Sequence, residues 1–355
     1  MKTKKRNVAI LFGGCSPEYG VSLESASAVI RNLNRTEYTS VLIGITKSGD
    51  WFYYTGPVEA IQDDTWHREE YCMPAVISPN QSAKELLVFD ETEVRHIPLD
   101  VALPVLHGKN GEDGTVQGVI TLAGIPLAGC GILASALCMD KDRAHRMAKL
   151  AGVCVPESMV LYAHQRENME EQAREFSTIV GFPIFVKPVK AGSSYGITKV
   201  NSVEEMYAAI KLAFQYDDEV ILEENIDGFE VGCAVCGRDE LLTGEVDEIE
   251  LSQGFFDFTE KYTLKTSAIH VPARITQEKA DEIKAAAKRI YRVLGCSGFA
   301  RVDMFLTPSG KIVFNEVNTI PGFTEHSRYP GMMKAAGISF QEILDRILEN
   351  ALMKG

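Results

Sequence analysis

The chain contains 355 residues, 45% of them hydrophobic, and its formal net charge at pH 7 is −13. This length and apolar content predict about two or three domains with a large packed core. The acidic balance, with no long basic stretch to offset it, argues against a nucleic-acid partner. No apolar run approaches the roughly 18 residues that a membrane span needs, and the run after the basic N-terminus ends at Gly13 and Gly14, too early for a signal peptide. We therefore expect a soluble, cytoplasmic protein with no membrane partner.

The eight cysteines are scattered along the chain, and Cys233 and Cys236 form its only C-x-x-C pair. No second pair and no histidine stands at the spacing of a zinc site. The pair lies inside the apolar run VGCAVCG, so we interpret it as two thiols of a buried strand. We expect the cysteines to be reduced.

The first third of the chain alternates short apolar runs with helical patterns. The expected elements are a strand over 7–14, a helix over 22–33, strands over 38–46 and 99–108, and a helix over 115–123. This order predicts a parallel sheet with flanking helices, in a Rossmann-like layout. The polar segment 56–96 is expected to be irregular, with a hairpin insertion. No Gly-x-Gly-x-x-Gly follows the first strand, which disfavours an NAD-dependent enzyme.

The rest of the chain predicts two further units of mixed strands and helices. The expected elements are a helix over 139–151, a strand over 180–188, a helix over 203–214, strands over 219–226, 228–237 and 244–251, a polar and aromatic loop over 253–267, a helix over 277–294, a hairpin over 301–318 and a helix over 340–352.

The hairpin is the most informative segment. Two apolar, alternating runs flank a Pro-Ser-Gly turn, which is typical of a β-hairpin. A two-residue loop of Ser309 and Gly310 would pair Pro308 with Lys311 and would fix the register of both strands.

That register places Asp303 opposite Glu316 and Arg301 opposite Asn318. Because side chains alternate along a strand, all four polar groups would share one face. Two carboxylates and an amide are hard oxygen ligands that suit Mg²⁺ and leave room for phosphate oxygens. Arg301 beside them could neutralise a developing oxyanion. The alternative is an ordinary hairpin with a solvated polar face.

Glycine-rich loops carry further polar groups. KPVKAGSSYG combines Lys187, Ser193 and Ser194 with glycines that let backbone N–H groups approach phosphate, although its order is not that of a Walker A loop. The alternative is a surface hairpin loop.

The run LHGKNGEDGTVQG places His107, Glu112 and Asp113 between a strand and a helix N-terminus, where an anion is favoured. We assign a functional role to His107 and expect Glu112 and Asp113 to cap and rigidify the turn. Glu18, on the loop after the first strand, suits a substrate ammonium group; helix-start electrostatics is the alternative.

The stretch NTIPGFTEHSRYP follows the hairpin directly and brings the backbone N–H groups near Gly322 close in sequence to Ser327 and Arg328. The run FFDFTEKYT, over 255–263, mixes aromatic and charged residues without a regular period. Such a run suits a loop that folds over a ligand, a partner-binding loop or a merely irregular one.

Taken together, these motifs resemble those of the D-alanine–D-alanine ligases, which are ATP-grasp enzymes. GGCSPE…VSLES, LHGKNGEDG, MDKDRAH, FVKP…AGSSYG, EEN…GFEVGCAV, FFDFTEKY, RVDMF and FNEVNTIPGFTEHS occur in the order and spacing of that family over nearly all of the chain. The run NTIPGFTEHSRYPGMM is most similar to the D-alanine–D-serine ligases associated with vancomycin resistance.

The resemblance implies an α/β and α+β architecture, an ATP-grasp fold with an N-terminal Rossmann-like domain. The implied domains are an N-terminal substrate domain over 1–133, a central ATP-grasp subdomain over 134–224 and a C-terminal ATP-grasp and Mg²⁺-binding domain over 225–355. By analogy with relatives we expect a homodimer.

The resemblance also implies roles for individual residues. The implied ATP contacts are Lys141, Lys187, Lys261 and Ser193 at the phosphates, Glu223 and Ile226 at the adenine, and Glu230 at the ribose. The implied ligands of two Mg²⁺ ions, which Mn²⁺ could replace, are Asp303, Glu316 and Asn318. The implied substrate contacts are Glu18 at the ammonium of the first D-alanine, His107 near its carboxylate, Arg301 and the Gly322 N–H at the oxyanion, and Ser327 at the second carboxylate. Glu18, Ser194 and Tyr262 would form a hydrogen-bonded set that closes the site.

Two departures from the family pattern bear on function. Gly20 replaces an acidic residue that usually follows the first glutamate, so Glu18 is the only carboxylate there. Arg328 replaces a usually apolar residue, and a polar wall could favour a second substrate with a hydroxyl, directly or through water. Tyr262 is typical of peptide-forming ligases, which ranks D-lactate last.

We therefore predict an ATP-dependent ligase that joins D-alanine to D-serine for vancomycin resistance. A D-alanine–D-alanine ligase of routine cell-wall synthesis is the alternative. A catalytically idle relative that binds nucleotide only is the rival from another class.

Overall fold

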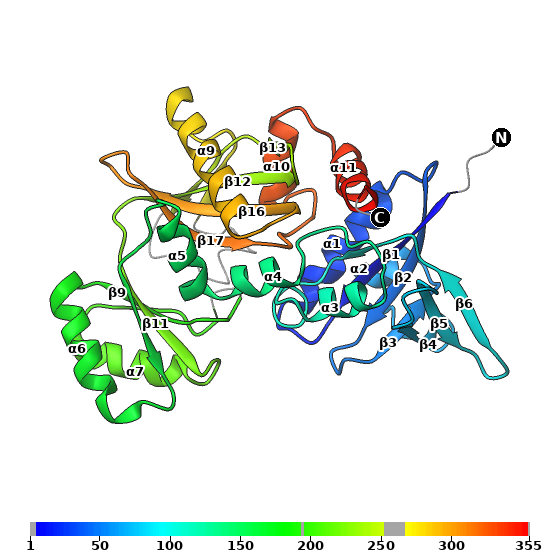
Figure 1. Ribbon diagram of the computed structural model, residues 1–355, viewed down its shortest axis with the longest axis horizontal. Helices are drawn as coiled ribbons and strands as arrows, with labels where there is room; N and C mark the ends of the chain where they lie inside the picture. Colours follow the sequence, from blue (N-terminus) through cyan, green and yellow to red (C-terminus); the bar gives the residue numbers. More distant parts are fainter. Residues whose placement is uncertain (1–4, 193–194, 252–266, 354–355) are drawn as a thin grey trace.

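The computed structural model describes residues 5–192, 195–251 and 267–353, which form three β-sheets and the helices that pack on them. Figure 1 shows the N-terminal sheet and the central sheet at opposite ends of the long axis of the molecule. Within the described residues, no helix combines the length and the apolar character that crossing a membrane requires.

The N-terminal sheet has seven strands in the order β6-β5-β4-β3-β2-β1-β7. Its strands are β1 (Arg6–Gly13), β2 (Tyr38–Ile45), β3 (Trp51–Tyr54), β4 (Cys72–Ile77), β5 (Glu85–Phe89), β6 (Val94–Pro98) and β7 (Val101–Pro104). Strand β1 pairs in parallel with β2 and β7, which confirms the predicted parallel sheet at this edge. The helices of this unit are α1 (Tyr19–Asn32), α2 (Val58–Gln62) and α3 (Thr115–Leu122).

The expectation of an irregular segment over 56–96 was wrong, but the hairpin insertion predicted there is confirmed by the antiparallel strands β4, β5 and β6. Strands β3 to β6 continue the sheet in antiparallel pairs. Alternate side chains of β4 and β5, among them Ala75, Ile77, Leu86 and Val88, are buried in one core, whereas the residues between them are more exposed. The two-residue alternation is weak in the sequence because polar residues separate single apolar ones.

The central sheet has the order β10-β9-β11-β8. Its elements are β8 (Ser158–Tyr162), the short 3₁₀ turn η1 (Arg166–Asn168), α6 (Met169–Val180), β9 (Ile184–Pro188), β10 (Thr198–Val200), α7 (Val203–Ala213) and β11 (Glu219–Glu224). The strand predicted over 180–188 begins only at Ile184, because Val180 ends helix α6. Gly181, with φ of 74°, turns the chain out of that helix.

The helix predicted over 139–151 corresponds to α5 (Lys141–Leu150), and a helix that was not predicted, α4 (Ile132–Met139), precedes it. They separate at Asp140, whose extended backbone and side chain cap α5 by accepting a 2.9 Å hydrogen bond from the Arg143 N–H. Side chains of both helices join the core beneath α9, so this segment packs on the C-terminal sheet.

The C-terminal sheet has the order β15-β14-β12-β16-β17, with β13 paired to β12. Its elements are β12 (Phe229–Gly237), β13 (Leu241–Thr243), β14 (Asp247–Leu251), β15 (Ser267–His270), α9 (Gln277–Val293), β16 (Gly298–Leu306), β17 (Ile312–Asn318), α10 (Arg328–Ala335) and α11 (Phe340–Leu352). The bounds of α11 agree with the predicted helix. It begins at a capping box formed by Ser339 and Glu342.

Cys233 and Cys236 confirm the buried-strand interpretation. Both lie on β12 and are at most 2% exposed, and they face different hydrophobic cores on the two sides of the sheet.

The hairpin β16–β17 has the predicted pairs at its far end but not the predicted turn. Arg301 lies opposite Asn318 and Asp303 opposite Glu316. The Thr307 N–H, however, donates to the Lys311 carbonyl at 3.0 Å, so the turn is longer than two residues and Pro308 does not pair with Lys311.

An irregularity restores the register. Met304 lies opposite Phe314 and Asp303 opposite Glu316, so Asn315 is an extra residue in β17. The longer turn and this bulge compensate each other. The four polar side chains therefore share one face, as predicted, for a reason that the sequence did not reveal.

Candidate functional site

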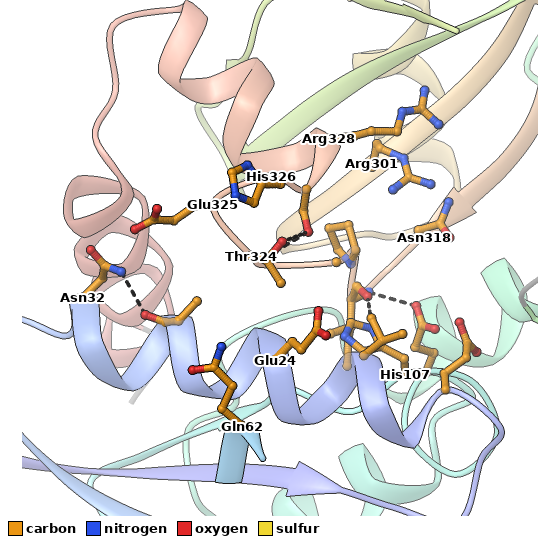
Figure 2. A pocket seen from close by; sticks show the side chains of 18 of the residues that line it. Glu24, Asn32, Gln62, His107, Arg301, Asn318, Thr324, Glu325, His326 and Arg328 are labelled. Atoms are coloured by element: carbon orange, nitrogen blue, oxygen red, sulfur yellow. Dashed lines mark hydrogen bonds between the residues drawn. The ribbon is translucent and has the colours of Figure 1, made fainter. Parts of the chain in front are cut away.

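A cavity of about 730 Å³ lies between the N-terminal unit and the C-terminal sheet. In Figure 2, helix α1 forms one wall, and the segment after β17 with the start of α10 forms the other. The predicted site residues that line it are Glu18, His107, Arg301, Gly322, Ser327 and Arg328 from the substrate contacts and Asn318 from the metal ligands.

Glu18 immediately precedes α1 and is 9% exposed. Two glycines make room for its carboxylate, since a Cβ added at Gly108 or at Gly192 would meet Glu18 Oε2. Gly192 belongs to the glycine- and serine-rich loop of the central unit. The structure thus brings Glu18 to the loop with which the sequence associated it.

His107 links the two walls of the cavity. The ring is buried, its Nδ1 lies 2.8 Å from the Ile320 carbonyl oxygen, and its Nε2 lies 3.3 Å from Ser25 Oγ. Burial lowers the pKa of His107, although Glu18 nearby acts in the opposite direction. Ser25 Oγ also accepts a hydrogen bond from the Phe323 N–H at 3.1 Å, so this pair fixes the backbone on both sides of Gly322.

Glu112 makes a second link between the walls. Its carboxylate accepts hydrogen bonds from the Gly108 N–H at 2.8 Å and the Ile320 N–H at 3.1 Å. Burial, with the Glu18 carboxylate nearby, raises the pKa of Glu112 to about 8. Asp113 accepts hydrogen bonds from the backbone N–H groups of Asn110 and Thr115. Both residues rigidify the turn, as predicted.

The proposed metal ligands lie together on the polar face of the hairpin. Asp303 is 1% exposed and accepts hydrogen bonds from Arg301 and, at 2.9 Å, from Asn318 Nδ2. Glu316 faces Asp303 across the hairpin, and Lys141 Nζ lies 3.9 Å from Glu316 Oε2. Burial alone would raise the pKa of Asp303, but Arg301 and Arg328 hold it below its usual value.

This donor set fits a hard cation. The described residues contain no cluster of three or more His, Cys, Asp and Glu side chains placed to hold a metal ion. The hairpin offers two carboxylates and one amide oxygen instead, with the polar groups of a large cavity beside them. Such an oxygen-only, incomplete set is what Mg²⁺ uses when phosphate oxygens complete its coordination.

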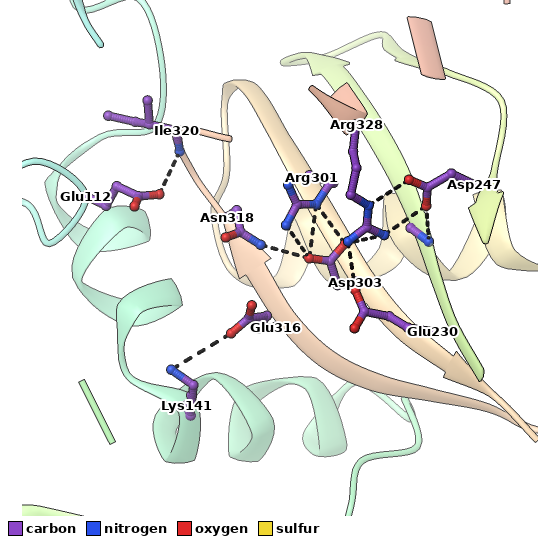
Figure 3. A network of polar contacts seen from close by, with 11 residues as sticks. Glu112, Lys141, Glu230, Asp247, Arg301, Asp303, Glu316, Asn318, Ile320 and Arg328 are labelled. Carbon is purple, nitrogen blue, oxygen red and sulfur yellow. Dashed lines mark hydrogen bonds and ion pairs between the residues drawn. The ribbon is translucent and has the colours of Figure 1, made fainter. Parts of the chain in front are cut away.

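Arg328 lies differently from what the sequence suggested. It begins α10, is 8% exposed, and its guanidinium is surrounded by carboxylates (Figure 3). Nε and Nη2 donate to Asp247 at 2.7 and 2.8 Å, Nη1 donates to Glu230 at 2.7 Å, and Nη2 lies 3.3 Å from Asp303 Oδ1. Arg328 lines the cavity as a fixed group, and most of its N–H donors are already used.

The proposed nucleotide residues gather on the side of the hairpin that faces the central unit. Lys141, at the start of α5, donates to the Ala191 carbonyl at 2.9 Å. Lys187 on β9 forms an ion pair with Glu223 on β11, and both are buried. Ile226 follows β11 and is half-buried. Glu230, implied at the ribose, pairs with Arg328.

Ser327 lines the cavity between the two walls. Its Oγ accepts a 3.0 Å hydrogen bond from the Thr324 N–H and lies 2.8 Å from Thr324 Oγ1. Four predicted site residues, Ser193, Ser194, Lys261 and Tyr262, lie outside the described residues.

Asp247 supports the site and was not predicted from the sequence. Asp247 is fully buried and anchors Arg328, while also accepting a 2.8 Å hydrogen bond from the Gly232 N–H. The sequence offered little signal, because Asp247 is one of several acidic residues in the predicted strand 244–251, and only its burial shows that it needs a partner.

The fold and the site define an ATP-dependent ligase of the ATP-grasp class. The chain belongs to the D-alanine–D-alanine ligase family: residues 7–130 match the D-ala D-ala ligase N-terminus and residues 147–349 match its C-terminus. The predicted fold class and enzyme class are confirmed.

Relatives from both branches of the family span almost the whole chain. The vancomycin B-type resistance protein VanB of Enterococcus faecalis is 45% identical over 98% of this chain and 99% of its own length. A D-alanine–D-alanine ligase of Caldicellulosiruptor bescii is 41% identical over 99% of this chain and 96% of its own. The crystal structure of the VanG D-Ala:D-Ser ligase from Enterococcus faecalis is 56% identical, with a TM-score of 0.91, and covers 98% of this chain and 100% of that one.

Proposed function

We propose that this enzyme joins D-alanine to D-serine at the expense of ATP, making a peptidoglycan-precursor dipeptide that confers vancomycin resistance. The 56% identity with a D-Ala:D-Ser ligase over nearly the full length carries the proposal. The polar wall that Arg328 gives to the cavity supports it. The proposed substrates are small molecules, and the reaction requires no nucleic-acid or membrane partner. We further propose that the enzyme is a homodimer and that it acts in the cytoplasm.

The first half of the proposed reaction activates a carboxylate. Glu18 would hold the ammonium of the first D-alanine, with His107 near its carboxylate. That carboxylate attacks the terminal phosphorus of ATP, the bond from this phosphorus to ADP breaks, and an acyl phosphate and ADP result. Lys141, Lys187 and Lys261 would neutralise the phosphates, while Glu223, Ile226 and Glu230 would hold the adenosine and Ser193 would cover the phosphates.

Divalent metal belongs to this class of enzyme, and Asp303, Glu316 and Asn318 would hold it as two Mg²⁺ ions, or Mn²⁺ in their place. When bound, the metal would offset charge on the phosphoryl group in transfer.

The second half forms the peptide bond. Ser327 would bind the carboxylate of D-serine, whose amine attacks the acyl carbon. Arg301 and the Gly322 N–H would hold the negative oxygen of the tetrahedral intermediate, and phosphate then leaves. The predicted set of Glu18, Ser194 and Tyr262 would keep water from the acyl phosphate.

The surroundings of Arg328 refine its proposed part in specificity. Because its guanidinium is held by Asp247 and Glu230, it would act on the hydroxyl of D-serine as a fixed polar wall, reached through water. A matching apolar wall would favour the methyl group of D-alanine instead.

The experiment is phosphate release by the purified protein with ATP and MgCl₂, with D-alanine alone, D-alanine plus D-serine, or D-alanine plus D-lactate, and with products identified by mass. D-alanyl-D-serine as the dominant product supports the proposal. Dominant D-alanyl-D-alanine would favour the second candidate, a D-alanine–D-alanine ligase. The 41% identity with the D-alanine–D-alanine ligase of Caldicellulosiruptor bescii supports this candidate.

A further inference from the structure

Lys187 has two tasks that conflict. In the structure its Nζ forms an ion pair with Glu223 Oε2, and the side chains are 10% and 3% exposed. In the proposed reaction the same amine contacts a phosphate of ATP. Removing the cation from a buried carboxylate is strongly destabilising. The adenine that Glu223 would contact offers only a neutral N–H donor, so Glu223 still needs a second, charged partner when Lys187 turns toward the nucleotide.

His145 on α5 lies on the other side of Glu223. Its ring is buried, and Nδ1 lies 3.6 Å from Glu223 Oε1. Among the described residues, neither His145 Nδ1 nor Glu223 Oε1 has a hydrogen-bond partner, and both atoms are buried. Two unsatisfied buried polar atoms that face one another mark an interaction not yet made.

The protonation of the ring explains why it is not made. His145 Nε2 lies 2.6 Å from the Asn315 carbonyl oxygen, which can only accept, so Nε2 carries the hydrogen. In the neutral ring Nδ1 then presents a lone pair to a carboxylate oxygen. One added proton at Nδ1 would turn this contact into a charge-assisted hydrogen bond.

The charges around the ring decide when that proton is bound. Glu223 favours the imidazolium, whereas Lys187 and Lys141 oppose it, and the edge of Phe314 adds no charge. Burial lowers the pKa of His145 and outweighs the attraction of Glu223. Withdrawing the Lys187 ammonium removes one opposing charge and leaves Glu223 without its main partner, so both changes favour proton uptake.

We propose that His145 is a positioning residue of the nucleotide site. When Lys187 turns to a phosphate of ATP, His145 binds one proton from solvent at Nδ1 and donates a hydrogen bond to Glu223. The inference rests on the proposed function, because it needs nucleotide at Lys187. It also links two parts of the site: the carbonyl that orients His145 belongs to Asn315, the bulge residue next to Glu316.

The test is isothermal titration calorimetry of the full-length protein with a non-hydrolysable ATP analogue and MgCl₂ near neutral pH, in buffers of different ionisation enthalpy. The wild-type protein is expected to take up a substantial fraction of one proton on binding. His145→Gln keeps an amide donor for the Asn315 carbonyl but cannot gain a proton, so its uptake is expected to fall to near zero. His164→Gln, at an exposed histidine of the central unit that also contains Glu223, is the matched control and keeps the wild-type uptake.

A second readout is the affinity itself. The analogue should bind the wild-type protein up to about tenfold more weakly for each unit of rising pH in the window where uptake occurs, and His145→Gln should remove this slope. Equal proton uptake by wild type and His145→Gln overturns the inference. Binding of the analogue to the wild-type protein without proton uptake also overturns it, and this result does not depend on whether the variant folds. A wild-type protein that does not bind the analogue at all contradicts the proposed function instead.

Discussion

Replacing Glu112 with glutamine is expected to remove a large pH dependence from the stability of the N-terminal unit. Glu112 lies buried between the backbone N–H groups of Gly108 and Ile320, and its pKa is raised from 4.5 to about 8. A carboxyl whose folded-state pKa is raised favours the folded state most when protonated. Its contribution is fully present below the unfolded-state pKa, about 4.5, and is lost as pH rises through about 8.

The size of the effect follows from the shift. Each pK unit corresponds to about 1.4 kcal/mol, so the shift sets a ceiling of about 5 kcal/mol on the stability lost between about pH 4.5 and about pH 8. The Glu18 carboxylate nearby contributes to the raised pKa of Glu112, and a loss of about 3–5 kcal/mol is the expected order of magnitude for the wild type. Glutamine has no proton to lose and should flatten this part of the profile.

The assay is urea unfolding followed by tryptophan fluorescence across about pH 5 to 8.5. It reports on the right unit, because the only two tryptophans of the chain, Trp51 and Trp66, both lie in the N-terminal third. Asp113→Asn is the control: it alters hydrogen bonds of the same turn but keeps the Glu112 carboxyl. A Glu112→Gln profile as steep as that of the wild type, or a wild-type stability that rises with pH over this window, would refute the reasoning.

Two further substitutions test the polar face of the hairpin. Asp303→Asn should lower kcat by at least about tenfold and shift the MgCl₂ dependence to higher concentration; retained activity would remove Asp303 from the metal site. It should also lower the melting temperature, because the buried Arg301 guanidinium loses its carboxylate partner. Arg328→Leu should move the ratio of kcat/KM values toward D-alanine by about tenfold, roughly 1.4 kcal/mol. It should also destabilise the protein by about 3–5 kcal/mol, because fully buried Asp247 loses its cation. Adding Asp247→Asn should recover part of that stability, and an unchanged substrate ratio in either variant would end the specificity argument for Arg328.

The hairpin β16–β17 shows which features of the site the local sequence pattern could predict and which it could not. Alternation correctly gathered Arg301, Asp303, Glu316 and Asn318 on one face, because that depends only on residues near each strand end. The turn length was wrong and the Asn315 bulge was missed, since nothing in the mixed apolar and polar run KIVFNEVN marks one extra residue. The turn is one residue longer than predicted and the bulge adds one residue to β17, so the two errors in register cancel at Asp303 and Glu316.

Arg328 shows where local pattern fails. Its identity was a clear departure from the family, but its partners Asp247 and Glu230 lie 81 and 98 positions away along the chain. Only the folded sheet brings them together, so the sequence suggested an available guanidinium where the structure has one held by carboxylates. The role of His145 could not be predicted either, because its neighbours Glu223 on β11 and Asn315 on β17 lie far from it along the chain.

The measurement that tests the central claim most directly is a competition. The purified enzyme would be given ATP, MgCl₂ and equal concentrations of D-alanine and D-serine near neutral pH, and the two dipeptides would be quantified by mass spectrometry at low conversion. The account predicts an excess of D-alanyl-D-serine over D-alanyl-D-alanine. An excess of D-alanyl-D-alanine would contradict it.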